Sequence, residues 1–263
     1  MASSASHPTE TAVLGGPEAT ASRISAGVAP LRAGEGQEFW WRRLHSLSGI
    51  FPIGAFLLEH FFSNAFATNG GAAYNENVRF LTGLPFVLWL EILFIYIPLA
   101  YHGGYGVYIW LRGESNVGPA YPWLGNWMYT AQRYTGIVAV LYIGYHTWTM
   151  RFSGAHILTH SEIAFAKVWS ELQNPWVIAF YVIGIVCASW HFAYGIWLFC
   201  AKWGIVVGEG GRKRAGRVCV LIGLAMIAIG GSSLYAFMTT PESAVPNLQE
   251  FRSLQGLPAP DVR

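Results

Sequence analysis

The chain has 263 residues, of which 53% are hydrophobic and 11% are charged, and its formal net charge is +2. An average soluble domain has roughly 25% charged residues, so this composition indicates an integral membrane protein. The small net charge gives no reason to expect a nucleic-acid partner. The three cysteines form no CxxC or CxxCH pattern, which argues against a disulfide framework and against covalently attached haem.

The predicted elements begin with a tail over residues 1–37, which is rich in Ala, Ser, Gly and Thr. It has no apolar core after a basic start, so it does not resemble a secretory signal, and we expect it to be flexible and cytoplasmic. Beyond it, five stretches have the roughly 20 mostly apolar residues that cross a bilayer. These stretches are 44–66, 84–111, 131–151, 175–201 and 216–238.

The segments between and after these stretches are more polar. The loops 67–83 and 152–173 are moderately long, and the second could hold a short surface helix. Residues 240–263 contain four prolines and are expected to be a loose C-terminal extension. The sequence therefore predicts an all-α integral membrane bundle of five transmembrane helices within residues 38–239.

Basic residues near the ends of the stretches predict the orientation of the chain. One side has nine of them, whereas the loops on the other side have only Arg79, Arg151 and Lys167. Because lysine and arginine are enriched in cytoplasmic loops, this bias predicts a multi-pass protein of the cell inner (cytoplasmic) membrane with a cytoplasmic N-terminus. The nine residues are Arg42, Arg43, Arg112, Arg133, Lys202, Arg212, Lys213, Arg214 and Arg217.

Four histidines, His60, His102, His146 and His191, each lie in a different predicted helix, at intervals of 42, 44 and 45 residues. Counting about 1.5 Å per residue from the basic residue at the inner end of each helix gives their depths. His102 and His191 both lie roughly 15 Å above the inner boundary, and the other two lie nearer the outer face. The sequence therefore predicts an inner pair, His102 with His191, and an outer pair, His60 with His146.

Paired histidines on facing membrane helices suit the binding of two b haems. The iron of a b-type haem takes axial ligands from both faces, and two imidazoles give a low-spin centre suited to electron transfer. The alternative is that these histidines only form hydrogen bonds between helices. A weak internal repeat accompanies the pairs, because His102 and His191 each begin the pattern HxxYG[VI].

Glycines near the histidines could let a flat macrocycle approach the helix backbones, although glycine is also common at plain helix contacts in membranes. These glycines are Gly54, Gly103, Gly104, Gly106, Gly144 and Gly195.

His45 is a fifth candidate. It lies two residues beyond Arg43, so we expect it near the inner headgroup boundary, too shallow to face His102 or His191 directly. It could bind haem propionates, a quinone headgroup or a partner subunit, or it could contact lipid headgroups. The neighbours that could share such a site are Arg42, Arg43, Ser48 and Arg133.

Two carboxylates, Glu91 and Glu59, lie within the predicted helices. Ionisable groups at such depth are costly and are functional candidates, so either could relay protons to a quinone site or to the outer haem edge. Glu59 could instead extend outward or pair with a neighbour on its helix. The remaining histidines are interpreted as solvated surface residues. They are His7, His156 and His160.

Four stretches of the chain are FWWRRLHSLSGIFPIGAFLLEH, LPFVLWLEILFIYIPLAYHGGYG, NWMYTAQRYTGIVAVLYIGYHTW and WHFAYGIW. Together they resemble the cytochrome b membrane-anchor subunit of succinate dehydrogenase, the enzyme also called respiratory complex II. The most similar type is the five-helix, two-haem cytochrome b558. The resemblance covers about residues 37–238 and includes neither tail.

The resemblance implies that the chain carries no succinate chemistry itself. In that family a flavoprotein subunit oxidises succinate and an iron-sulfur subunit passes the electrons on. The anchor binds both at the cytoplasmic face and exchanges electrons with a quinone, usually menaquinone, near the outer haem. The family's axial ligands fall on His102 and His191 for the inner haem and on His60 and His146 for the outer haem. His45 matches a family histidine that is not a ligand.

Three other functions are compatible with these residues. The same subunit could work in a quinol:fumarate reductase, since the anchors of both enzymes look alike. A transporter or channel could use the histidines and Glu91 as a proton relay without haem. The chain could also be a scaffold whose haems only stabilise assembly.

Overall fold

The computed structural model describes residues 35–114, 117 and 123–256, and every regular element within these residues is a helix. The chain divides into two compact units, Met1–Arg42 and Arg43–Arg263. Only the beginning of helix α2 is described in the first unit, and there Arg42 forms an exposed ion pair with Glu38 at 2.6 Å. The predicted tail up to residue 34, which includes His7, lies outside the described residues.

The first predicted stretch, 44–66, consists of two helices that meet at a proline. Helix α2 (Glu35–Ile50) ends shortly before Pro52, and α3 (Ile53–Ala65) begins directly after it. Proline has no backbone N–H and its ring crowds the preceding turn, which explains the interruption. A short 3-10 turn, η1 (Phe66–Asn69), extends α3.

The second stretch contains a widened turn at its centre. Helix α5 (Val87–Glu91) continues through a π-helical turn, η2 (Ile92–Tyr96), into α6 (Ile97–Arg112). Pro98 lies two residues after this turn. Because proline cannot donate to the carbonyl four residues earlier, a local change of helical pitch lets the segment continue.

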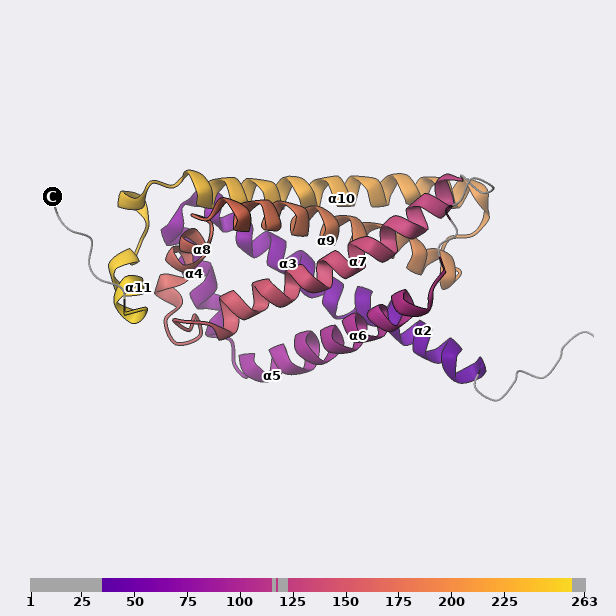
Figure 1. Ribbon diagram of the computed structural model, residues 1–263, viewed down its shortest axis with the longest axis horizontal. Coiled ribbons are helices and arrows are strands. Elements are labelled where there is room, and N and C mark those ends of the chain that lie inside the picture. The colour runs from indigo at the N-terminus through magenta and orange to yellow at the C-terminus, as the bar shows by residue number, and fades with distance from the viewer. Residues whose placement is uncertain (1–34, 115–116, 118–122, 257–263) are drawn as a thin grey trace, which may run out of the picture. The chain divides into compact units, whose positions relative to one another are not determined.

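Three further long helices complete the second unit. They are α7 (Leu124–Thr147), which a π-helical turn η3 (Trp148–Phe152) extends, α9 (Pro175–Lys202) and α10 (Gly208–Thr239). Helix α9 packs against both α7 and α10 (Figure 1). A Cβ atom added to Gly223 of α10 would lie 3.2 Å from the Cβ of Ala193 in α9, so small residues allow these two helices to approach closely.

Four helical segments within the described residues are long and apolar enough to cross a membrane. They are Gly36–Asn69, Val87–Arg112, Pro175–Lys202 and Gly208–Thr239. The predicted all-α, membrane-spanning class is confirmed. The fifth predicted span, 131–151, falls on α7 and η3 and is not among the four, because its many Tyr, Thr, Gly, His and Trp residues lower its mean hydropathy. A count of five spans therefore stays a prediction.

The remaining helices of the second unit form a compact group that we call the cap. Figure 1 shows α4, α8 and α11 gathered beyond the end of α10. The cap consists of α4 (Gly71–Thr82), η4 (Ser161–Ile163), α8 (Ala164–Glu171), η5 (Glu242–Ala244) and α11 (Leu248–Leu254).

Two predictions about this region need correction. The short helix expected in the second loop is present as α8, but it does not lie on the surface, because its Phe165 is completely buried in the cap core. The extension after residue 240 is not loose up to residue 256, because Val245, Leu248 and Phe251 are buried in the same core. Apolar residues from several separate segments form this core, so no single segment reveals it by its own composition.

Polar side chains join the parts of the cap. Asn75 of α4 donates to the carbonyl of Glu162, and its Oδ1 accepts from the backbone N–H of Phe165 at 2.7 Å. Lys167 is buried and donates from Nζ to the carbonyls of Ser153 and Ala155, both at 2.7 Å. Burial disfavours the charged form of Lys167 and lowers its pKa. Lys167 is therefore a buried residue of the cap rather than a solvated loop residue.

We expect Phe165→Ala to lower the free energy of unfolding by about 3–5 kcal/mol, because it removes a buried ring and leaves a cavity. Denaturant or thermal unfolding in a mild detergent measures this change. Phe80→Ala is the matched control on α4, since the Phe80 ring is 67% exposed. An equal loss of unfolding free energy in both variants would show that the buried cap core contributes no more to stability than an exposed ring does.

Candidate functional site

The structure brings the inner pair together from two different helices. His102 lies in α6 and His191 in α9, and their ring centroids are 6.2 Å apart with an interplanar angle of 85°. Two imidazoles that share a metal at roughly 2 Å from each nitrogen have ring centroids on the order of 6 Å apart. The separation of this pair thus fits an iron bound between the two rings.

A backbone carbonyl on a neighbouring helix lies beside each ring of the inner pair. His102 Nδ1 is 2.9 Å from the carbonyl oxygen of His45 in α2, and His191 Nδ1 is 3.1 Å from that of Gln132 in α7. A carbonyl only accepts, so Nδ1 must carry the proton in both rings. The Nε2 lone pair is then available to a metal, which is the usual arrangement of metal-binding histidines.

Glycine makes both of these hydrogen bonds sterically possible. Gly49 and Gly136 each follow the accepting residue by four positions, which places them beside the accepting carbonyl on the helix surface. A Cβ atom on Gly49 would overlap His102 Cε1, and one on Gly136 would lie 2.8 Å from His191 Cε1. The two glycines therefore form the cradle into which the imidazoles fit.

The same arrangement occurs in both halves of the bundle. In each half, the first helix supplies a carbonyl and a glycine four residues later, and the second helix supplies the histidine that begins HxxYG[VI]. The weak internal repeat in the sequence thus corresponds to a repeated contact in the structure. In the second half the contact is reciprocal, because Gln132 Nε2 donates back to the carbonyl of His191 at 2.9 Å.

The outer pair is also brought together, but with different partners. His60 of α3 and His146 of α7 have ring centroids 5.6 Å apart, with an interplanar angle of 71°. His146 Nδ1 lies 3.1 Å from the hydroxyl of Tyr181, and the amide nitrogen of Asn64 lies 3.3 Å from His60 Nε2. Asn64 has to turn away before this nitrogen of His60 can bind a metal, so the inner pair fits the chemistry more closely.

The expectation that His45 is too shallow to face the inner pair was wrong. Its ring stacks on His102, with centroids 4.2 Å apart and an interplanar angle of 6°, while its carbonyl accepts from the same side chain. The depth count took each helix as running straight across the membrane and made no allowance for tilt. The guanidinium of Arg43 lies 4.7 Å from the ring centre of Trp203, which follows Lys202 at the end of α9, so the two basic residues do lie at one level.

Arg133 binds the end of a neighbouring helix, and its predicted contact with a propionate or a quinone stays a prediction. Its guanidinium donates to the carbonyls of Trp110 and Gly113 at 2.7 Å and to that of Glu114 at 2.9 Å. The last carbonyls of a helix have no partner within the helix, and a cation there also opposes the negative end of the helix dipole. Arg133 therefore stabilises the end of α6 from the neighbouring α7.

The two carboxylates have different surroundings. Glu91 forms an ion pair with Arg151 of η3 at 2.5 Å, and both side chains are only 20% exposed. Glu59 is exposed on α3 and accepts a hydrogen bond from Ser63 of the same helix. Of the two, Glu91 is partly buried and paired with a residue of another element, whereas Glu59 pairs with a neighbour on its own helix.

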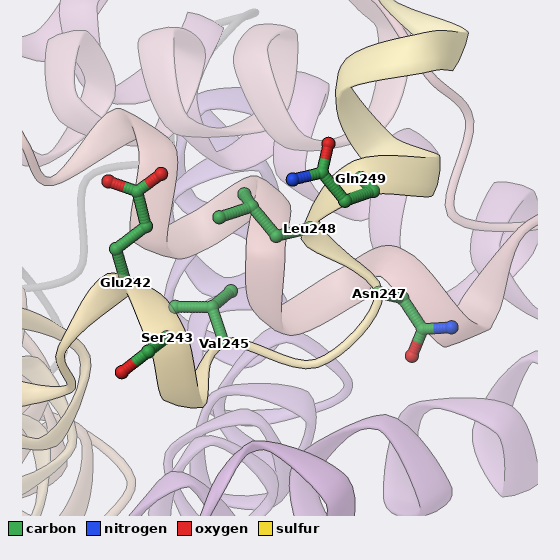
Figure 2. A pocket seen from close by; sticks show the side chains of 6 residues that line it. All are labelled: Glu242, Ser243, Val245, Asn247, Leu248 and Gln249. Carbon is green, nitrogen blue, oxygen red and sulfur yellow. The ribbon is translucent and has the colours of Figure 1, made fainter. Parts of the chain in front are cut away.

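The remaining candidates lie apart from the histidine pairs. His156 is exposed, but His160 is only partly exposed and its Nδ1 lies 3.1 Å from Glu162 Oε1, so it is not a simple solvated residue. A cavity of about 580 Å³ lies at η5 and α11 (Figure 2). Its lining residues, Glu242, Ser243, Val245, Asn247, Leu248 and Gln249, include no predicted site residue.

Several residues of the site were not anticipated. Gln132 is a polar residue within an expected span, and that placement could have marked it. Gly49 lies four residues after His45, and Gly136 lies four residues after Gln132. This common spacing is the only signal for the two glycines, and it is weak because His45 and Gln132 have different side chains. Tyr181 and Asn64 give no distinguishing signal in a sequence rich in aromatic and polar membrane-interface residues.

Long apolar helices with histidines paired across them define a multi-pass helical membrane protein with candidate metal ligands between its helices. The family described as "Succinate dehydrogenase/Fumarate reductase transmembrane subunit" matches residues 116–230. The succinate dehydrogenase cytochrome b558 subunit of Bacillus subtilis (strain 168) is 36% identical over 202 residues, which is 77% of this chain and 98% of the relative.

A second relative is the succinate dehydrogenase hydrophobic membrane anchor subunit of Thermoplasma acidophilum, which is 29% identical over 114 residues. This match covers 42% of the chain and 87% of the relative. The chain belongs to the family of cytochrome b membrane-anchor subunits of succinate dehydrogenase.

We expect Gly49→Ala and Gly136→Ala each to weaken haem b binding by about 10- to 100-fold, the usual effect of disturbing a partner that orients a metal-binding histidine. Haem content per purified chain, measured from the pyridine haemochrome spectrum, checks this. Gly231→Ala on α10 is the control, because a Cβ there meets nothing within 4 Å. Full haem content in both cradle variants would contradict the role of the glycines.

Proposed function

We propose that the chain is the membrane-anchor cytochrome b subunit of a succinate:quinone oxidoreductase, respiratory complex II. The observation that carries this proposal is the pairing of four histidines from four helices in a chain of this family. His102 and His191 would hold an inner haem b, and His60 and His146 an outer haem b. When bound, the two haems supply one-electron transfer at two depths of the membrane.

The chain's own residues prepare these sites. The carbonyls of His45 and Gln132 keep the proton on Nδ1 of the inner histidines, which leaves Nε2 free to bind iron. The hydroxyl of Tyr181 orients His146 in the outer pair. The ring of His45 lies beside the inner pair, and Arg43 lies against Trp203 at the end of α9. We assign both a supporting role rather than that of ligands.

The partners and the orientation follow from the same proposal. The names of the two relatives, "cytochrome b558 subunit" and "hydrophobic membrane anchor subunit", support a chain that attaches catalytic subunits to the membrane. We place a flavoprotein and an iron-sulfur subunit at the cytoplasmic face, together with the N-terminus, because the basic residues concentrate there. Helix α7 would then be the fifth span of a bundle over residues 38–239.

We assign quinone reduction to the end of the bundle near the outer pair. Reduction of a quinone to the quinol takes up one proton for each electron, so the site needs a proton donor. The Glu91 carboxyl is the candidate donor, and Arg151 holds its side chain in place. The quinone is proposed to be menaquinone, as is usual for anchors of this type.

A quinol:fumarate reductase is the second candidate, since the matching family includes anchors of both enzymes. There the same subunit would take electrons from a quinol. Assays of the purified complex in both directions, with the quinone that the organism makes, separate the two functions. A rate of fumarate reduction well above that of succinate oxidation would select the second candidate.

We expect the purified wild-type protein to contain two low-spin, bis-histidine haems b. His102→Ala should lose the inner haem and His146→Ala the outer haem, because each removes one axial ligand. His156→Ala, at an exposed position, should retain both. Optical and EPR spectra with haem quantification measure this. Wild-type protein without a Soret band would instead favour a haem-free proton relay.

We expect Glu91→Gln to lower the rate of quinone reduction by at least about 100-fold, the typical contribution of a positioned proton donor. Electron transfer from succinate to an artificial acceptor at the catalytic subunits should not change. Glu59→Gln is the matched control. If Glu91→Gln reduces quinone at the wild-type rate, Glu91 is not the donor, whereas the haem assignment is unaffected.

A further inference from the structure

A groove with a volume of about 930 Å³ lies where the start of α7, the end of α9 and the start of α10 meet. It is separate from the histidine pairs, and nothing in the proposed electron transfer uses it. Its lining residues are Leu124, Met128, Trp197, Gly208, Glu209, Arg212, Lys213, Gly216, Arg217, Val220 and Leu221.

The groove has an ordered aromatic wall. The ring of Trp197 stacks on Tyr194 with centroids 5.5 Å apart, and its Nε1 donates to the carbonyl of Arg212 at 3.1 Å. Gly216 lies next to this ring, and a Cβ atom there would be in ordinary van der Waals contact with Trp197, 3.7 Å from Nε1. The apolar side chains of Leu124 and Leu221 continue the walls and are 74% and 66% exposed.

The charged residues of the groove lie along one face of α10. Lys213 and Glu209 form an ion pair at 2.7 Å and neutralise each other. Within the part of the chain that the structure describes, neither Arg212 nor Arg217 has an acidic partner. The groove therefore has two uncompensated positive charges, next to the N-terminal end of a long helix, which also favours anions.

We propose that this groove binds one anionic diacyl phospholipid. The phosphate would lie between Arg212 and Arg217, and the acyl chains would lie along the apolar residues of α7 and α10. Basic pockets between membrane helices are suited to acidic headgroups, and each arginine near the headgroup contributes to the attraction. A zwitterionic lipid would fill the same apolar walls but leave the positive charge uncompensated, so the charge selects the lipid.

Native mass spectrometry of the delipidated complex, titrated with dioleoyl-phosphatidylglycerol or dioleoyl-phosphatidylcholine, tests this proposal. We expect one phosphatidylglycerol per chain to bind more tightly than phosphatidylcholine. Arg212→Gln and Arg217→Gln should each weaken this binding by about fivefold, the effect of removing one basic residue near an anionic headgroup. Arg214→Gln is the matched control, since Arg214 is exposed on the same helix but does not line the groove.

A second variant separates shape from charge. Gly216→Leu leaves the charge unchanged and fills the groove beside Trp197. It should therefore abolish the tight binding of one phosphatidylglycerol per chain. Equal affinity of the wild type for the two lipids would overturn the proposal. Equal losses of phosphatidylglycerol affinity in Arg214→Gln and Arg217→Gln would also overturn it. Loss of the catalytic subunits from the Arg217→Gln complex, with lipid binding intact, would identify the groove as a subunit interface instead. None of these outcomes depends on the haem ligands.

Discussion

A helix carbonyl that already accepts a hydrogen bond within its own helix can accept another from outside only where the neighbouring side chain leaves room. The inner histidine pair depends on this condition twice. Gly49 gives His102 access to the carbonyl of His45, and Gly136 gives His191 access to that of Gln132. The proton position on both rings, and with it the nitrogen offered to a metal, is thus determined by the backbones of α2 and α7.

Helix α7 contains polar residues that bind its neighbouring helices. Gln132 accepts from one histidine and donates to its backbone, while Arg133 binds three carbonyls at the end of α6. Both residues are costly within a bilayer, yet both have partners on adjacent helices. Helix α7 is therefore joined to α6 and α9 by polar contacts as well as by packing.

Sequence reasoning predicted the features that depend on regular helix geometry. The constant rise per residue paired His102 with His191 and His60 with His146, and both pairs are in contact. It failed where position depends on the partner helix, as for His45, which stacks on a ring expected to lie much deeper. The cap was missed for the same reason, because Phe165 and Phe251 belong to one core only after distant segments meet.

The composition of the cap core has a consequence for the order of assembly. Its residues come from the connection after α3, from η3 and the connection before α9, from α9 and α10 themselves, and from the segment after α10. The core can close only after the last helix has been inserted, because Leu248 and Phe251 follow that helix in the chain. Phe165 already contacts Tyr74 of α4 and Phe237 of α10, and the segment after α10 adds Val245, Leu248 and Phe251 to these contacts. The cap core is therefore completed last, by the part of the chain that follows α10.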